Sequence, residues 1–415
     1  MKTIVVELSR AFMKAATGLE AKDAILVVKP EQEIEGLFVN AITGPAGLRP
    51  GAREDYEKIT AYFASLTQDA ELQENIRKEV KAISHYVREG AVYRPSYETV
   101  RDYVLSKCSY ICAEIVREEC GGTIVDGTDI MVCYETEDGI KVDWEASMAN
   151  LKEFGRKGGN LVISAGYGRT QDGYRRSLGA RASDLMAMTI ASATGCDGVD
   201  VFISKAPGIA SLTYEEAAML CSLEDGLVTP SSLLPVRAKG IPVRLISLTD
   251  PASITEISDK QAATGGLITG YTVEEGLALI NVKGTSLVGK VGVSSAIFGA
   301  LARNDVNIRF ISQPSSEHCI SIAIRAVDAE KALSALAPVT LDGEESVSLE
   351  SNVSILSVFG ARMKKVPGAS GKVFSALGAA GVNIIAAAQG GDELSISLVI
   401  AKEDSAKAGE ALSKL

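Results

Sequence analysis

Four arginines lie close together in the middle of the chain, just before a segment with the pattern of a helix. They are Arg169, Arg175, Arg176 and Arg181, and they fall within thirteen residues. Guanidinium groups beside the amides of a helix N-terminus form a good site for a phosphate or a carboxylate. The pattern therefore indicates anion binding. The alternative is that these arginines form surface ion pairs in an acidic protein.

A second set of residues occurs twice near the C-terminus, at a constant spacing of 76 residues. In each copy a glycine precedes a helical pattern, and an asparagine and a glutamine flank the following strand. The two sets are Val291, Gly292, Asn307, Ile308 and Gln313, and Pro367, Gly368, Asn383, Ile384 and Gln389. Helix amides bind carboxylates, and amide side chains bind amino groups. The sets predict two amino-acid sites, whereas the alternative is that they only satisfy turns and strand edges.

The elements around these sets have the order β-α-β-β in both copies. Apolar strands are expected at 277–282 and 320–323 in the first copy, and at 353–358 and 396–400 in the second. A closing helix and strand would complete a ferredoxin-like unit. Because only two copies occur, the region is a duplicated small domain and not a longer repeat array.

The preceding part of the chain alternates short apolar strands with helical patterns. Ser183 is expected to cap the helix after the arginines, and Gly195 to end it. A polar stretch near 252–265 is expected to be the hinge to the duplicated region. The expected strands are 4–8, 24–28, 199–204 and 240–248. Residues 122–132 are expected to contain a strand and a turn, and residues 158–168 a strand that enters a glycine-containing loop. The main helical segments are 52–89, 99–119 and 183–195. This alternation predicts a mostly parallel α/β sheet covered on both faces.

Composition limits the class of protein. The chain has 415 residues, a formal charge of −11 and a pI near 5.0, which argue against nucleic acid or an anionic membrane as the main partner. No apolar run approaches the ~20 residues of a membrane span. Seven scattered cysteines and two histidines give no zinc pattern and favour free thiols in a reducing cytoplasm.

Longer stretches resemble the aspartate kinase family. ISQPSSEHCISIAI and AAQGGDELSISLVI are similar to the tandem ACT domains of the threonine-sensitive type that is fused to homoserine dehydrogenase. VISAGYGRTQDGYRRSLGARASD resembles the family loop that ends in R-G-G-S-D. The resemblance implies an amino-acid-kinase-like domain at 1–260 and ACT domains at 266–340 and 341–415, with strand exchange between the ACT domains as an option.

The resemblance also implies an activity. It points to ATP-dependent phosphorylation of the side-chain carboxylate of L-aspartate or a related amino acid, with ATP and Mg²⁺, under control of a threonine-class or lysine-class effector. A homodimer or higher homo-oligomer is expected, because pairing ACT sheet edges between chains would bury them. Two alternatives stay open: a non-catalytic amino-acid sensor that regulates a partner, and a kinase fold that binds another anionic ligand.

Positions matching the family motifs give the candidate site. Asp184 would hold Mg²⁺ or order the phosphate loop, Arg181 would neutralise phosphate charge, and Asp102 would face the amino group of the substrate. The remaining candidates for substrate or nucleotide binding are Gly166, Gly168, Gly173, Arg175, Arg176 and Ser183. The residues predict no metal site held by protein ligands alone.

The first strand departs from the family pattern. The family's K-F-G-G-T-S begins with a lysine that neutralises transferred charge, but here Glu7 holds that position, and Ser9 and Arg10 hold the glycine positions. The loss of that charge predicts slow or absent phosphorylation. Lys2, Lys14 and Lys29 are the candidate replacements, and nothing in the sequence selects one.

Overall fold

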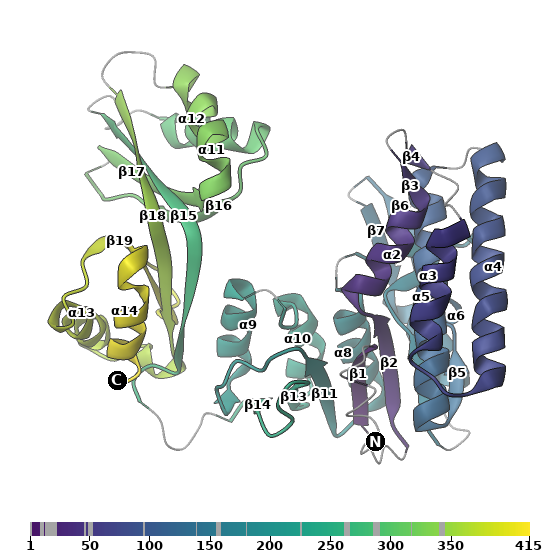
Figure 1. The fold of residues 1–415 in the computed structure, drawn as a ribbon. Coiled ribbons are helices and arrows are strands. Elements are labelled where there is room, and N and C mark those ends of the chain that lie inside the picture. Colours follow the sequence, from purple (N-terminus) through teal and green to yellow (C-terminus); the bar gives the residue numbers. More distant parts are fainter. Residues whose placement is uncertain are drawn as a thin grey trace. The chain divides into compact units, whose positions relative to one another are not determined.

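The computed structural model describes residues 2–8, 12, 23–44, 47–48, 53–93, 96–137, 139–154, 159–179, 181–224, 226–260, 266–284, 291–316, 318–339 and 345–415. The chain separates into two compact units, the first formed by residues 1–214 and 226–260 and the second by residues 215–225 and 261–415 (Figure 1). Ser9, Arg10, Lys14 and the side chain of Glu7 lie outside the described part. The domain boundaries inferred from the sequence stay a prediction.

An eight-stranded sheet forms the centre of the first unit, and the mostly parallel sheet predicted from the sequence is confirmed. All neighbouring strands run parallel except for one antiparallel pair, β13 and β14. The order is β12 (Ser211–Leu212), β14 (Ile254–Ile257), β13 (Val243–Ser247), β11 (Gly198–Ile203), β1 (Lys2–Leu8), β2 (Ile25–Pro30), β8 (Leu161–Ser164) and β5 (Thr123–Val125). β14 lies inside the stretch that was expected to be a hinge.

Helices cover both faces of this sheet. On one side pack α2 (Gln32–Ile42), α3 (Arg53–Ala64), α4 (Ala70–Tyr93) and α5 (Tyr97–Cys120), and on the other α8 (Ala182–Thr194), with α10 (Leu233–Arg237) against it. α5 begins because Ser96 accepts a hydrogen bond from the Thr99 amide. Its apolar residues Val100, Val104, Leu105, Ile111, Ile115 and Val116 are buried, and all seven cysteines are free thiols.

A smaller sheet flanks the first. Its order is β10 (Arg175–Ser177), β9 (Tyr167–Arg169), β6 (Val132–Thr136) and β7 (Gly139–Asp143), accompanied by α6 (Gly127–Ile130) and α7 (Trp144–Phe154). The segment 158–168, predicted as a strand entering a glycine-containing loop, contains β8 and the beginning of β9, which belong to different sheets. Gly166, with φ of 91°, lies between them, in a conformation that side chains disfavour. A short pair, β3 (Thr43–Gly44) and β4 (Gly47–Leu48), completes the described strands of this unit.

One six-stranded antiparallel sheet forms the second unit (Figure 1). Four helices, α11 (Val293–Arg303), α12 (Ala329–Leu336), α13 (Ala369–Ala379) and α14 (Ser405–Leu412), pack on one face of it. On the other face, apolar side chains from all six strands form a separate core. The strand order is β16 (Ile308–Ser312), β17 (Cys319–Arg325), β15 (Gly270–Gly284), β18 (Glu345–Phe359), β20 (Ser395–Ala401) and β19 (Ile384–Gln389).

The two central strands are more than twice as long as predicted, because their outer halves are polar and lack an apolar run. The second half of β15 pairs with β17 and with the first half of β18, while its first half pairs with the second half of β18. Each long strand therefore contributes to both repeats. Bulges lie at the crossover, where Gly276 (φ 76°) and Asn352 (φ 59°) adopt left-handed conformations. These two residues are also related by the repeat spacing.

Residues 215–225 group with the second unit, although they lie within the first in sequence. They include most of α9 (Tyr214–Leu223). The Glu216 side chain is buried, and its Oε1 accepts hydrogen bonds from Thr269 Oγ1 at 2.5 Å and from the Ala361 amide at 2.8 Å. Because a buried carboxylate needs such partners, Glu216 fixes α9 to the beginning of the second unit.

Candidate functional site

A buried carboxylate lies at the carboxyl end of the parallel sheet. Asp184 is in the first turn of α8, and its side chain is wholly buried. Arg181 Nε lies 3.1 Å from Asp184 Oδ2, and Lys29 Nζ, from the end of β2, lies 3.8 Å from Oδ1. Within the described residues, Oδ1 has no hydrogen-bond partner. The carboxylate is thus held between two cations and keeps one oxygen available to a ligand.

Arg181 and not Ser183 precedes the helix, so the predicted N-cap was wrong. Arg181 is in a left-handed conformation (φ 58°, ψ 24°), and the helix begins at the next residue. Its side chain makes no capping hydrogen bond and instead reaches Asp184. Ser183 is therefore inside the first turn and buried. The left-handed residue starts the helix earlier than the position of the serine suggested.

The third proposed catalytic residue, Asp102, is engaged elsewhere. It lies on α5 and is 4% exposed. Its Oδ2 accepts a hydrogen bond from the Ser177 amide at 3.0 Å, and its Oδ1 pairs with Arg101 Nη2 at 3.0 Å. The Ser177 contact ties α5 to β10, and the Arg101 pair lies within α5, so in this structure Asp102 holds the edge strand of the smaller sheet against α5.

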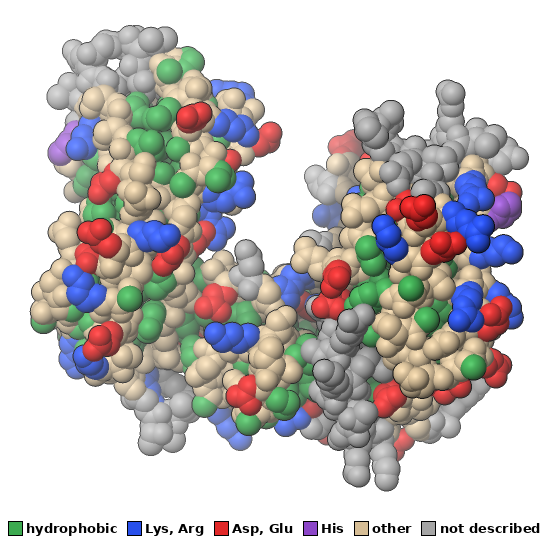
Figure 2. Space-filling model, viewed as in Figure 1, with side chains coloured by type: hydrophobic (Ala, Val, Ile, Leu, Met, Phe, Trp, Pro, Cys, Tyr) green, Lys and Arg blue, Asp and Glu red, His purple; other side chains and the backbone are tan. Residues whose placement is uncertain are grey.

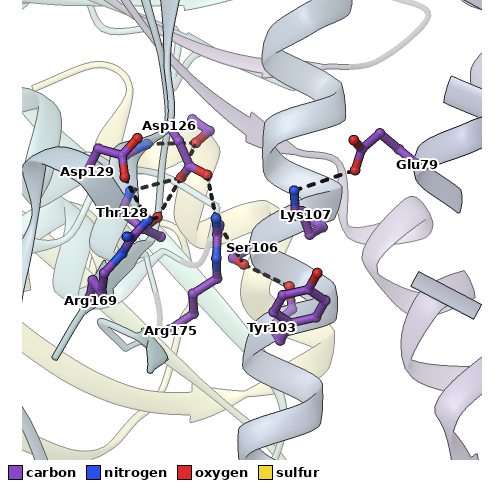
Figure 3. Close-up of polar contacts among 11 residues, drawn as sticks. Glu79, Tyr103, Ser106, Lys107, Asp126, Thr128, Asp129, Arg169 and Arg175 are labelled. Carbon is purple, nitrogen blue, oxygen red and sulfur yellow. Dashed lines mark hydrogen bonds and ion pairs between the residues drawn. The ribbon is translucent and has the colours of Figure 1, made fainter. Parts of the chain in front are cut away.

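The four arginines of the sequence cluster are each paired with a carboxylate. Besides Arg181, Arg169 pairs with Asp129 at 2.6 Å, Arg175 with Asp126 at 2.8 Å and Arg176 with Glu135 at 2.6 Å. Figure 3 shows Arg169 and Arg175 pointing toward the Asp126–Asp129 turn. This is the arrangement that the ion-pair alternative describes. Anion binding by these side chains stays a prediction, and it would require their present partners to be displaced.

Two of the glycines proposed to bind substrate or nucleotide have structural roles in a hairpin. Gly173 has φ of 85° in the turn between β9 and β10. Gly168 lies within β9, where an added Cβ would come to 3.0 Å from the Met131 carbonyl oxygen. Tight turns and close strand packing select glycine as binding loops do, so the residue type alone does not distinguish these uses.

The Asp126–Arg175 pair is the most buried of the arginine contacts in the smaller sheet. The two side chains are 12% and 14% exposed, and Arg175 also donates to Ser106 Oγ at 3.2 Å (Figure 3). Burial raises the pKa of Asp126, but the Arg175 charge and the hydrogen bonds from Thr128 and Arg175 outweigh it, so the net pKa is below its usual value. Asp126 also caps α6. One carboxylate thus joins α6, β10 and α5.

The two predicted amino-acid sites occupy equivalent places in the second unit. Gly292 and Gly368 directly precede α11 and α13 in left-handed conformations, with φ of 94° and 85°. Asn307 and Asn383 directly precede β16 and β19, and Gln313 and Gln389 lie at the ends of these strands. Val291, Pro367 and these asparagines and glutamines are exposed, and Ile308 and Ile384 are half-buried. Each set is therefore accessible to a small ligand.

Ser370 was missed by the sequence interpretation. Its Oγ donates to Gln389 Oε1 at 3.2 Å, which joins the start of α13 to the end of β19. Ser294 is the equivalent residue of the first copy at the same spacing. The repeat itself contained this signal, because the serine is retained in both copies two residues after the glycine that precedes the helix.

Comparisons with known proteins agree with this architecture. The ACT domain family matches residues 280–338 and 356–415. The chain is 27% identical over 381 residues to a chloroplastic bifunctional aspartokinase/homoserine dehydrogenase 1 of Arabidopsis thaliana, covering 85% of this chain and 41% of that protein. It is 26% identical over 272 residues to aspartokinase 2 of Bacillus subtilis, covering 61% of this chain and 66% of that protein. The chain spans less than half the length of the bifunctional relatives it matches.

Solved structures share the whole fold. Aspartokinase III of Escherichia coli, in complex with lysine and aspartate, has a TM-score of 0.81 at 18% identity and covers 100% of this chain and 99% of its own. The aspartate kinase of Clostridium acetobutylicum has a TM-score of 0.79 at 19% identity, and the match covers 100% of this chain and 98% of that one. The protein therefore has a domain with the amino-acid kinase fold, followed by ACT domains.

Together with the sequence relatives, these likenesses show that the chain is similar to aspartokinases that carry ACT domains. Among the described residues, no helix combines the length and the apolar character that crossing a bilayer requires. On the face drawn in Figure 2, acidic and basic side chains lie among one another over both units.

We predict that Asp126→Asn lowers the free energy of unfolding of the first unit by about 2 kcal/mol at pH 7, because Arg175 loses its charged partner. A lowered folded pKa stabilises the fold above the unfolded pKa of about 4, and this stabilisation is lost as the pH falls through the folded value. The difference between variant and wild type should therefore shrink near pH 3. Urea unfolding followed by fluorescence of Trp144, the only tryptophan, measures it.

The matched control is Asp129→Asn, which removes an exposed pair with Arg169 and should cost less than about 1 kcal/mol. The side-chain amide that Asp126→Asn introduces can still cap α6, so the comparison isolates the charge. An equal deficit for Asp126→Asn at pH 3 and pH 7 would contradict the prediction.

Proposed function

We propose that this chain phosphorylates the side-chain carboxylate of L-aspartate, or of a related small amino acid, using ATP, under control of an amino acid bound to its ACT domains. One observation carries the proposal: a chain similar to the aspartokinases places the Asp184 carboxylate between Lys29 and Arg181 where β2 ends and α8 begins. In open α/β sheets, ligands bind outside the carboxyl ends of the strands.

The residues at this position are compatible with Mg²⁺ and ATP. Asp184 Oδ1 is buried and lacks a hydrogen-bond partner among the described residues, as expected of a group with a ligand to bind. No group of three or more His, Cys, Asp or Glu side chains in the described part forms a metal cage. Mg²⁺ needs none, because it binds one or two carboxylates together with phosphates and water. When bound, Mg²⁺ neutralises phosphate charge.

The protein groups have the following roles in this proposal. Arg181 neutralises charge on the phosphates of ATP, and Asp184 orients the groups beside them. Asp102 binds the amino group of the substrate: its two oxygens have about four lone-pair sites, and Ser177 and Arg101 use part of them. Transfer requires little covalent chemistry from the protein, because positioning and charge stabilisation supply most of the rate.

The proposed reaction is slow. Glu7 stands where the family has a lysine, and the nearby arginines are paired with carboxylates. We predict that a hydroxamate assay with aspartate, ATP and Mg²⁺ gives a rate at least about a hundredfold below that of aspartokinase 2 of Bacillus subtilis. Asp184→Ala should abolish this activity. Glu7→Lys alone should not raise it to the ordinary level, because Ser9 and Arg10 still occupy the glycine positions.

Rapid turnover in the wild type that is lost in Asp184→Ala would contradict the prediction of a slow reaction. It would still support the proposal that the chain is a kinase. Lys239→Ala, at an exposed position of the same unit, serves as the matched surface control.

A second candidate function is a non-catalytic amino-acid sensor. It is favoured by the two internal contacts of Asp102 and by the paired arginines, since both arrangements occupy groups that a kinase would direct at its substrates. An absence of turnover together with intact amino-acid binding at the ACT domains would select this function.

We predict that the ACT region binds an amino acid of the threonine or lysine class. Isothermal titration calorimetry with each of the twenty amino acids should identify the effector, with a Kd below about 1 mM. The double variant Gln313→Ala and Gln389→Ala should weaken binding by ~1–3 kcal/mol, because each change removes a hydrogen-bond partner. Binding that the double variant leaves unchanged would place the effector elsewhere. Gln73→Ala, in the first unit, is the control.

The ACT region is also the proposed site of self-association. It has two sheet-edge strands, β16 and β19, and several large apolar side chains that are more than a third exposed: Val291, Ile311, Leu349, Val366 and Phe374. Such edges and apolar groups favour contact with a second copy. A monomer mass in light scattering at micromolar concentration would refute a homodimer or larger homo-oligomer. The cytoplasmic location stays a prediction.

A further inference from the structure

Lys29 occupies the same level of the sheet as Glu7. β1 and β2 are parallel neighbours, and their register pairs the Glu7 backbone with that of Lys29. Neighbouring strands lie about 4.8 Å apart. The β1 position that bears a carboxylate thus has a lysine directly beside it on the next strand. Among the three lysines considered from the sequence, Lys29 has a described side chain, and it lies against Asp184, whereas Lys14 and the side chain of Lys2 are outside the described part.

Lys29 is one of two cations that approach the same buried carboxylate. Lys29 Nζ and Arg181 Nε contact different oxygens of Asp184, at 3.8 and 3.1 Å. The carboxylate is fully buried, but the Lys29 side chain is 19% exposed and that of Arg181 is 29% exposed. A polyanion in solvent can therefore reach both cations without meeting the carboxylate first.

The position of this group favours a phosphate accompanied by Mg²⁺ as its ligand. It lies at the start of α8, a helix of thirteen residues whose N-terminal amides attract anions. Asp184 Oδ1 is buried without a hydrogen bond among the described residues, and such an acceptor fits the Mg²⁺ that accompanies ATP, while the two cations fit its phosphates. A purely structural lysine would also neutralise Asp184, so the two roles must be separated by experiment.

We infer that Lys29 is a catalytic residue that binds the γ-phosphate of ATP and supplies the charge that Glu7 does not. The inference rests on the proposed kinase function. In the transfer, a carboxylate oxygen of the substrate bonds to the γ-phosphorus as the bond from that phosphorus to the β–γ bridging oxygen breaks, and the electron pair leaves with ADP. Lys29 stabilises charge on the transferred group and neither gains nor loses a proton.

The test compares MgATP and MgADP binding by titration calorimetry. Lys29→Met should weaken MgATP binding about tenfold or more, because a charged hydrogen bond is worth about 1.5–3 kcal/mol, and should change MgADP binding less than about threefold. Lys29→Arg should retain most of the preference for MgATP. Lys58→Met, at an exposed position on α3, removes the same charge and should leave both affinities unchanged.

A measurement on the wild-type chain covers the case in which Lys29→Met does not fold. Acetic anhydride labelling read by mass spectrometry should show Lys29 protected at least about fivefold by MgATP and less by MgADP, with Lys58 unaffected. Equal weakening of MgATP and MgADP, or labelling of Lys29 that MgATP does not change, would overturn the role of Lys29 while leaving the kinase proposal intact. Failure of the wild-type chain to bind MgATP would overturn both.

Discussion

The burial of one carboxylate constrains the first unit. Removing Asp184 from water without partners would cost several kcal/mol, so the fold has to bring cations to it. Lys29 at the end of β2 and Arg181 before α8 provide them. The contact fixes where α8 starts against the sheet, and it requires the left-handed turn at Arg181. Sheet, turn and helix are thus held in register by one charged group.

Ion pairs also organise the smaller sheet, but there each arginine has a carboxylate partner of its own. Its arginines and carboxylates pair with one another, and Asp126 connects α6, β10 and α5 through a contact with little exposure to solvent. These pairs join the smaller sheet to α6 and α5. The charges that could attract an anion are largely neutralised within the smaller sheet, whereas at Asp184 two cations share one carboxylate.

The sequence was informative where one residue type has one common use. Alternating apolar runs predicted the parallel sheet, and the helical segment predicted at 99–119 lies within α5. The arginine cluster and Gly168 were ambiguous, because arginine serves ion pairs as well as phosphates and glycine serves close packing as well as loops. Lys29 could not be selected, because its contact with Asp184 depends on the strand register and on a helix more than 150 residues away. The long outer halves of β15 and β18 were missed because they are polar.

The shared strands of the ACT region have a consequence for the order in which it is made. As a polypeptide emerges from N- to C-terminus, the first repeat receives its outer strand segment, residues 345–352, only after its helices α11 and α12 have been made. The second repeat depends on the opposite order, because its outer segment, residues 270–274, is synthesised before the whole of the first repeat. Residues 270–274 therefore wait for their pairing partners in β18 until the first repeat has been made.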